Sequence, residues 1–179
     1  MSSGVGTMSR EIVMNTVDKY DWVQIGGAIK HPDNGKIVDM NEATREESGV
    51  DDAFLKVYPV DGYGDHDLIR DLLHYEKPDC MWIMTDPRFY GWLWQIEEEI
   101  RKHCPLIYYH VWDNYPYPTY NRKHYLSNDV VATISKVTED IVKTVAPEVE
   151  CHYIPHAVDE DVFKPLPEEE NEKNRKILF

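Results

Sequence analysis

YIPHAVDEDVFKP (residues 153–165) is a short apolar run that stops at a proline and resumes as a turn. Proline has no N–H to give to a sheet, so we expect Pro155 to end a strand. Asp159 can accept hydrogen bonds from the amides that follow it, which predicts one short helical turn through Val162. Pro165 then stops that turn. The segment therefore predicts that a strand ends here and that the chain leaves it through a turn.

Upstream of this segment, apolar runs alternate with amphipathic stretches almost one to one. The predicted strands are residues 21–29, 54–60, 80–85, 106–111, 130–134 and 150–154, and the predicted helices are 5–19, 65–73, 89–102 and 136–145. Between them lie a polar, turn-rich insertion at 30–52 and an aromatic, proline-rich loop with a short helix at 112–128. This alternation predicts an α/β fold, a parallel sheet with helices on both faces. Ligands bind at the carboxyl ends of the strands in such sheets.

The length of 179 residues suits one α/β domain. We expect that domain to span residues 1–166. The acidic segment 167–176 reads as a solvated linker. Ile177-Leu178-Phe179 is predicted to begin a strand of a further domain.

Composition excludes several classes of function. A net charge of −14 argues against a nucleic-acid partner, because phosphate binding requires a basic surface. The longest apolar runs are shorter than the roughly 20 residues that span a bilayer. The three cysteines are widely spaced, which is typical neither of a disulfide framework nor of a zinc site. With no basic start or apolar core at the N-terminus, these features predict a cytoplasmic protein with reduced thiols.

Two candidate sites precede predicted helices. Gly4 and Gly6 come just before the helix at 5–19, where bare N–H groups and the helix dipole favour an anion. The alternative is a simple helix start. Asp86 and Arg88 follow the strand 80–85, where a charged pair could reach a substrate hydroxyl or phosphate. The alternative is that Asp86 caps the helix that follows it.

The richest candidate follows the strand 106–111. His110, Trp112, Asp113 and Asn114 come together there, among several tyrosines. Aromatic faces suit sugar rings, while carboxylate and amide groups bind hydroxyls. His110, as a proton carrier near neutral pH, and Asp113 are the candidate catalytic residues. The alternative is a packed loop with a buried, hydrogen-bonded histidine.

Two further candidates follow the last two predicted strands. Ser135 and Lys136 open the helix at 136–145, where Ser135 serves equally well as a helix cap. His156 follows the last strand and is expected at the same edge of the sheet. No metal site is predicted, since the histidines are scattered and show no ligand spacing.

The motif at 153–165 resembles the Pro-(Asn/His)-Gly-Val-Asp-x-x-x-Phe-x-Pro signature of family 4 glycosyltransferases, which have the GT-B fold of two Rossmann-like domains. The chain has Ala157 where that family has glycine. The resemblance runs from Gly4 to Pro165 and implies the N-terminal, acceptor-side domain. It implies that Gly4 and Gly6 belong to the family's glycine-rich loop. It also implies that His110, Asp113 and Asn114 lie on the acceptor side, and that Ser135 lines the cleft.

The same resemblance implies transfer of a sugar from a nucleotide-sugar donor to the hydroxyl of a glycan or lipid-linked acceptor. It implies no bound metal or other cofactor. The family holds the nucleotide mainly in its second domain, so we expect residues 1–179 alone to be inactive or nearly so. Only three residues precede Gly4, so the family's first strand is expected to be missing. A missing central strand would expose sheet edges, which favours self-association.

Other functions remain open at this point. The chain is alternatively a non-catalytic remnant of such a domain that binds a glycan or a partner. A dehydrogenase requires Gly-x-Gly-x-x-Gly after a strand, whereas this chain has Ser9 in place of the third glycine. Epimerases that share the two-domain fold also fit, because a fold does not determine the reaction.

Overall fold

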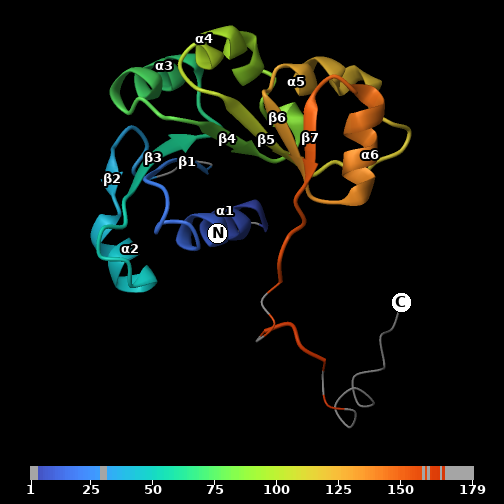
Figure 1. Ribbon diagram of the computed structural model, residues 1–179. Helices are drawn as coiled ribbons and strands as arrows, with labels where there is room; N and C mark the ends of the chain where they lie inside the picture. The colour runs from blue at the N-terminus through green and yellow to red at the C-terminus, as the bar shows by residue number, and fades with distance from the viewer. Residues whose placement is uncertain (1–3, 29–31, 159, 161, 166, 168–179) are drawn as a thin grey trace.

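The structure is a computed structural model that describes residues 4–28, 32–158, 160, 162–165 and 167 (Figure 1). Short 3₁₀ helices are labelled η. The elements in chain order are α1 (Gly4–Met14), β1 (Trp22–Ala28), β2 (Val38–Asp39), α2 (Asn41–Ser48), β3 (Leu55–Asp61), α3 (His66–Tyr75), β4 (Met81–Met84), η1 (Pro87–Phe89), η2 (Leu93–Ile96), α4 (Glu97–Arg101), β5 (Leu106–His110), η3 (Thr119–Asn121), α5 (Arg122–Leu126), β6 (Val130–Thr133), α6 (Lys136–Val145) and β7 (Glu150–Tyr153).

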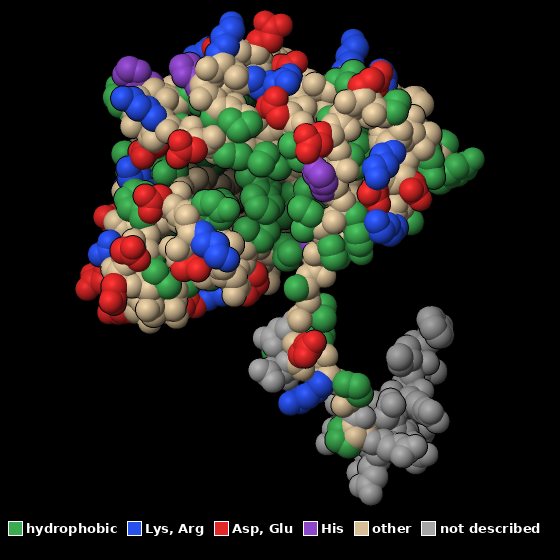
Figure 2. Space-filling view, viewed as in Figure 1, with side chains coloured by type: hydrophobic (Ala, Val, Ile, Leu, Met, Phe, Trp, Pro, Cys, Tyr) green, Lys and Arg blue, Asp and Glu red, His purple; other side chains and the backbone are tan. Residues whose placement is uncertain are grey.

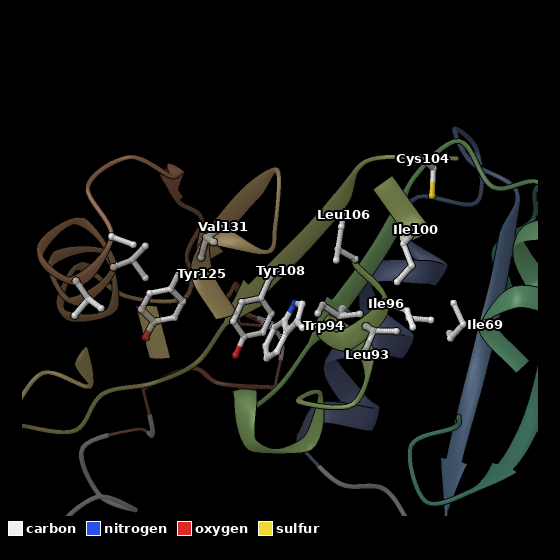
Figure 3. Packing of buried hydrophobic residues seen from close by; sticks show 14 of the residues in the cluster. Ile69, Leu93, Trp94, Ile96, Ile100, Cys104, Leu106, Tyr108, Tyr125 and Val131 are labelled. Carbon is white, nitrogen blue, oxygen red and sulfur yellow. The ribbon is translucent and has the colours of Figure 1, made fainter. Parts of the chain in front are cut away.

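Strands β4, β5, β6 and β7 form a parallel sheet in that order, which confirms the predicted α/β class. Helices cover both of its faces. On one face the side chains of α3, η2, α4, α5 and α6 build the main core with Ile83, Leu106 and Val131 (Figure 3). On the other face, Met8 and Ile12 of α1 pack against the sheet. The interior strands are therefore buried on both sides, as expected for parallel strands.

The prediction of one continuous sheet is wrong. The first strands form a separate sheet in the order β1-β3-β2, in which β1 and β3 are parallel and β2 is antiparallel to β3. The turn-rich segment 30–52 contains β2 and α2, which the sequence did not predict. Helix α2 is short and polar, and tertiary hydrogen bonds hold it: the Asn41 side chain accepts from Leu55 N, and Arg45 Nε donates to Ala53 O. Such a helix has no hydrophobic periodicity to detect.

Helix α1 lies between the two sheets. Val13 and Val17 pack against Leu55 of the β1-β3-β2 sheet, while Met8 and Ile12 reach the β4–β7 sheet. The helix ends at Met14, five residues before its predicted end, and the chain continues in turns to Lys19. The predicted helix at 89–102 is likewise shorter, because η1 and η2 occupy its first half.

The segment after β7 follows its prediction in part. β7 ends at Tyr153, two residues before Pro155, and the Ile154 carbonyl accepts a hydrogen bond from the Tyr109 hydroxyl. Among the described residues the only non-glycine positions with positive φ are Lys77 and Thr85, so Ala157 does not need the conformation that favours glycine. The predicted cap at Asp159 and the strand at 177–179 lie outside the described residues. None of the helices within the described ranges is long and apolar enough to cross a membrane.

Candidate functional site

The carboxyl end of β4 carries a charged pair on a strained turn. Thr85 directly follows β4 with φ of 137°, a conformation that β-branched residues rarely adopt. Asp86 then caps η1 by accepting from Arg88 N at 2.9 Å, as the capping alternative predicted. Arg88 also donates to both Asp86 oxygens, Nε to Oδ1 at 2.9 Å and a terminal nitrogen to Oδ2 at 2.8 Å. The turn therefore holds Arg88 and Asp86 in one fixed, bidentate pair.

This pair leaves Asp86 charged at neutral pH. Partial burial works to raise the pKa of Asp86, but the hydrogen bonds from Arg88 outweigh it and hold the pKa below its usual value. The Asp86 side chain is largely shielded, whereas the Arg88 side chain is 72% exposed. A ligand at this edge consequently meets the guanidinium first and the carboxylate behind it.

His110 lies beneath this pair, in the core rather than on the surface. Its Nδ1 lies 2.8 Å from the Tyr108 hydroxyl and its Nε2 lies 2.8 Å from the Tyr125 hydroxyl. Tyr108 donates its own proton to the Thr85 carbonyl at 2.7 Å, so its oxygen is the acceptor for His110 Nδ1–H. Nε2 of a neutral imidazole then accepts from Tyr125. The network ties His110 to the backbone of the strained turn.

Burial determines the chemistry of this histidine. His110 is 0% exposed, and burial lowers its pKa to about 3, against a smaller opposing effect of the Asp86 charge. Burial also raises the pKa of Tyr108 and of Tyr125. At neutral pH all three side chains are uncharged. This geometry is that of the alternative, a buried and hydrogen-bonded histidine. Through Tyr108 the imidazole holds the Thr85 carbonyl in place, and it does not carry protons near neutral pH.

Aromatic rings complete the surface beside Arg88. The Arg88 guanidinium lies 6.0 Å from the Trp112 ring centre, and Tyr120 meets Trp112 edge-on at 6.2 Å. Trp112 Nε1 is a buried donor that has no hydrogen-bond partner among the described residues. We call Asp86, Arg88, Trp112 and Tyr120 the β4 edge site. It combines a carboxylate, a guanidinium and two ring faces at the end of two parallel strands.

The other predicted residues lie apart from this site. Ser135 caps α6 by accepting from Thr138 N, and Lys136 lies 4.2 Å from the Tyr153 ring while pairing with Glu139. His156 stacks on Tyr109 with ring centres 5.5 Å apart. Tyr109 packs on the α1 face of the sheet and His110 on the other, so the sheet separates His156 from His110.

The remaining predicted residues are exposed. Asp113 and Asn114 lie in the loop after β5. Gly4 and Gly6 lie in the first turn of α1, not in a loop before it. Their expected place in a glycine loop is therefore wrong.

Sequence reasoning missed Thr85, Tyr120 and Tyr125, and it assigned no role to Tyr108. The period of two along a strand places Tyr108 and His110 on one face, and this signal could have indicated their pairing. The strain at Thr85 has no sequence signal. Within the described ranges, no group of three or more His, Cys, Asp or Glu side chains is placed to hold a metal ion. Two open surface hollows, one beside Trp94 and His124 and one beside Arg101, include no residue of the β4 edge site.

Comparisons with protein-family models, with curated proteins and with solved structures gave no match to this chain.

Proposed function

We propose that the chain is the acceptor-side half of a GT-B, family 4-like glycosyltransferase, a Rossmann-like domain that binds a sugar acceptor at the β4 edge site. The observation that carries the proposal is the rigid Asp86–Arg88 pair beside the Trp112 ring, at the carboxyl end of parallel strands. Sugars are bound by this combination, because C–H groups pack on aromatic faces while charged groups bind hydroxyls. The motif at 153–165 supports the same family.

The charges of the described residues favour an uncharged acceptor over a phosphate at this edge. Arg88 is paired with Asp86, and Lys136 is paired with Glu139. A diphosphate needs cations or helix N-termini that are free to neutralise it. The proposal therefore assigns the nucleotide-sugar donor to a further domain, which also places the catalytic charge stabilisation there.

Roles follow for the individual side chains. Asp86 accepts a hydrogen bond from the acceptor hydroxyl, Arg88 donates to a neighbouring hydroxyl, and Trp112 stacks on the ring. His110 is a positioning residue that holds the Thr85 turn through Tyr108. Asp113, in the loop after β5, is still predicted to contact the sugar acceptor. A cytosolic setting is part of the proposal and suits the three unpaired cysteines, Cys80, Cys104 and Cys151.

Binding of free glycans tests the proposal. Saturation-transfer NMR against a panel of mono- and oligosaccharides is expected to show a ligand for the wild-type chain. Arg88→Gln is expected to lower the affinity for that ligand at least about tenfold, because the substitution removes both the charged donor and the partner of Asp86. Arg101→Gln is the matched control, because Arg101 makes a similar pair with Asp129 at the opposite end of the sheet. Equal loss in both variants, or no glycan ligand at all, contradicts the proposal.

A transfer assay separates the enzyme from the non-catalytic alternative. The chain joined to a matching nucleotide-binding domain is expected to move labelled sugar from a nucleotide donor to the glycan that NMR identifies. Glycan binding without transfer in that joined protein would favour a binding domain.

A further inference from the structure

A pair of stacked aromatic rings lies next to the β4 edge site. Phe89 directly follows Arg88 in η1, and its ring stacks on the ring of Tyr63, with ring centres 4.6 Å apart and ring planes at 21°. Tyr63 comes from the turn between β3 and α3. The Tyr63–Phe89 pair therefore joins the loop that follows β3 to the loop that follows β4.

The turn that carries Tyr63 has a defined shape. Gly62 and Gly64 flank Tyr63, and both have positive φ, of 73° and 96°, a conformation that glycine adopts without strain. The ring of Tyr90, from the same loop as Phe89, meets the Tyr63 ring edge-on at 6.1 Å. These contacts place the Tyr63–Phe89 pair before any ligand binds, and such preorganisation lowers the cost of binding.

Both rings of the pair keep surface open to a ligand. Although each ring covers one face of the other, Tyr63 is 44% exposed and Phe89 is 39% exposed. Asp61 and Asp65, two residues from Tyr63 on either side, are also exposed. Ring faces beside carboxylates suit a sugar, whose C–H groups pack on the ring while its hydroxyls donate to carboxylate oxygens. The same carboxylates repel phosphates, and an alkyl chain would desolvate them without replacing their hydrogen bonds.

The Tyr63–Phe89 pair and the β4 edge site follow one another along the carboxyl ends of the strands. Tyr63 follows β3, Arg88 and Phe89 follow β4, and Trp112 follows β5. The Arg88 guanidinium lies 6.0 Å from the Trp112 ring centre, and consecutive residues such as Arg88 and Phe89 have Cα atoms about 3.8 Å apart. Arg88 therefore links two aromatic surfaces, one at Trp112 and one at the Tyr63–Phe89 pair.

Aromatic residues on the α1 face of the β4–β7 sheet have a different setting. Trp22, Trp82 and Tyr109 are in successive ring contact, with ring centres 6.3 and 5.9 Å apart. Tyr109 packs there with Met8 and Ile12 of α1. Figure 2 shows hydrophobic side chains in the hollow between the part that holds α1 and α2 and the part that holds β4–β7. Rings among apolar neighbours are typical of packing, whereas the rings at the carboxyl ends lie beside charged groups, as in a sugar site.

We propose that the acceptor is a linear oligosaccharide, in which one sugar stacks on Trp112 and a neighbouring sugar packs on the Tyr63–Phe89 pair. This inference rests on the proposed function, because it extends the acceptor beyond the β4 edge site. The Asp86–Arg88 pair binds hydroxyls of the sugar at Trp112. A single sugar, or a single sugar carried on a lipid, fills only part of this surface. Affinity therefore depends on the number of linked sugars.

Binding measured as a function of chain length tests the inference. The probes are glucose, galactose, mannose and N-acetylglucosamine, the linear dimers and trimers of each, and their octyl glycosides. Isothermal titration calorimetry measures the affinity of the full chain for each probe. For the sugar that binds, the trimer is expected to bind at least about fivefold more tightly than the monomer, because it reaches a second aromatic surface. The octyl glycoside is expected to gain less than the trimer.

Two substitutions assign this gain to the Tyr63–Phe89 pair. Phe89→Ala and Tyr63→Ala are each expected to remove most of the gain from monomer to trimer, because each removes one ring of the pair. Tyr75→Ala is the matched control and is expected to keep the gain, since it removes a 74% exposed ring from the far end of α3. Circular dichroism of the three variants confirms that they are folded before affinities are compared.

The results separate this inference from the proposed function. A sugar ligand that depends on Arg88 but gains no affinity with chain length would overturn the inference alone. So would a gain that persists in both Phe89→Ala and Tyr63→Ala, because the second sugar would then lie elsewhere. An octyl chain that gains as much as the trimer, and loses that gain in Phe89→Ala, would also overturn it, because the pair would then bind a lipid. If no sugar of any length bound, both proposals would be wrong.

Discussion

Strands β1 and β5, one from each sheet, are both largely apolar but reach very different degrees of burial. In β5 the side chains of Leu106, Tyr108 and His110 are 0% exposed. In β1, a strand of comparable composition, no described side chain is buried. The difference follows from the neighbouring strands, since within the described part of the chain β5 has a paired strand on each edge and β1 has one on a single edge. An apolar strand becomes core only when both edges and both faces are covered.

Polar groups differ between the sheets in the same way. Inside the β4–β7 sheet, His110 is 0% exposed and joins two tyrosine hydroxyls. Beside the β1-β3-β2 sheet, the Glu76 side chain is partly buried, at 13% exposed, and accepts hydrogen bonds from both Lys56 and the Tyr58 hydroxyl. Replacing one such polar group is therefore expected to lower the free energy of unfolding more in the β4–β7 sheet than in the β1-β3-β2 sheet.

The largest expected effect comes from removing one apolar side chain from each sheet. Leu106→Ala is expected to lower the free energy of unfolding by about 2–5 kcal/mol, because it leaves a cavity in a closed core. Ile25→Ala in β1 is expected to cost about 1 kcal/mol, since that side chain is only half-buried. Urea unfolding of the two variants measures the difference. Equal losses would show that the side chains of β1 are as well covered in solution as those of β5.

The α/β class and the parallel β4–β7 sheet were predictable because their strands are continuous apolar runs between clear helices. The separation of β1 and β4 into two sheets was not predictable in this way. Strand pairing is a tertiary property. The sequence of an apolar run such as 21–29 does not specify whether one strand or two will pair with it.

The candidate site was predictable only in part. Asp86, Arg88 and Trp112 were found because strand ends collect functional groups. His110 was placed on the correct strand, but its burial depends on Tyr125, which is brought in from α5. The separation of His156 from His110 depends on which face of the sheet the chain follows after β7, and the residues alone do not specify that.

A smaller effect is expected from the tight packing at the end of β1. A Cβ added at Gly27 would lie 2.5 Å from the Gly62 carbonyl oxygen, a backbone atom that cannot rotate away. Gly27→Ala is expected to cost about 1–3 kcal/mol, as is usual for overpacking. Gly91→Ala is the matched control, because an added Cβ there meets no atom of the described residues within 4 Å. Thermal unfolding that ranks the two variants equally would mean that the β1 end shifts freely and that this sheet is loosely held.

The smallest effect, counted per pH unit, is a pH dependence of stability that arises from His110 in the β4–β7 sheet. His110 has a pKa of about 3 in the folded chain, against 6.5 when unfolded. Between these two pH values the unfolded state therefore binds one more proton than the folded state. The contribution of neutral His110 to the free energy of unfolding is fully present above pH 6.5 and falls as the pH drops toward 3. The expected slope is about 1.4 kcal/mol per pH unit. Urea unfolding at a series of pH values between 4 and 7.5 measures it.

His110→Gln isolates this contribution from the other titrating groups. The glutamine amide can still donate to Tyr108 and accept from Tyr125, but it does not titrate. The variant is expected to lose stability at pH 7.5 through imperfect packing, and to show a shallower dependence on pH below 6.5. His103→Gln, at an exposed histidine, is expected to keep the wild-type slope. If His110→Gln kept that slope as well, the imidazole would be open to water, and the contrast in burial between the two sheets would be smaller than the structure indicates.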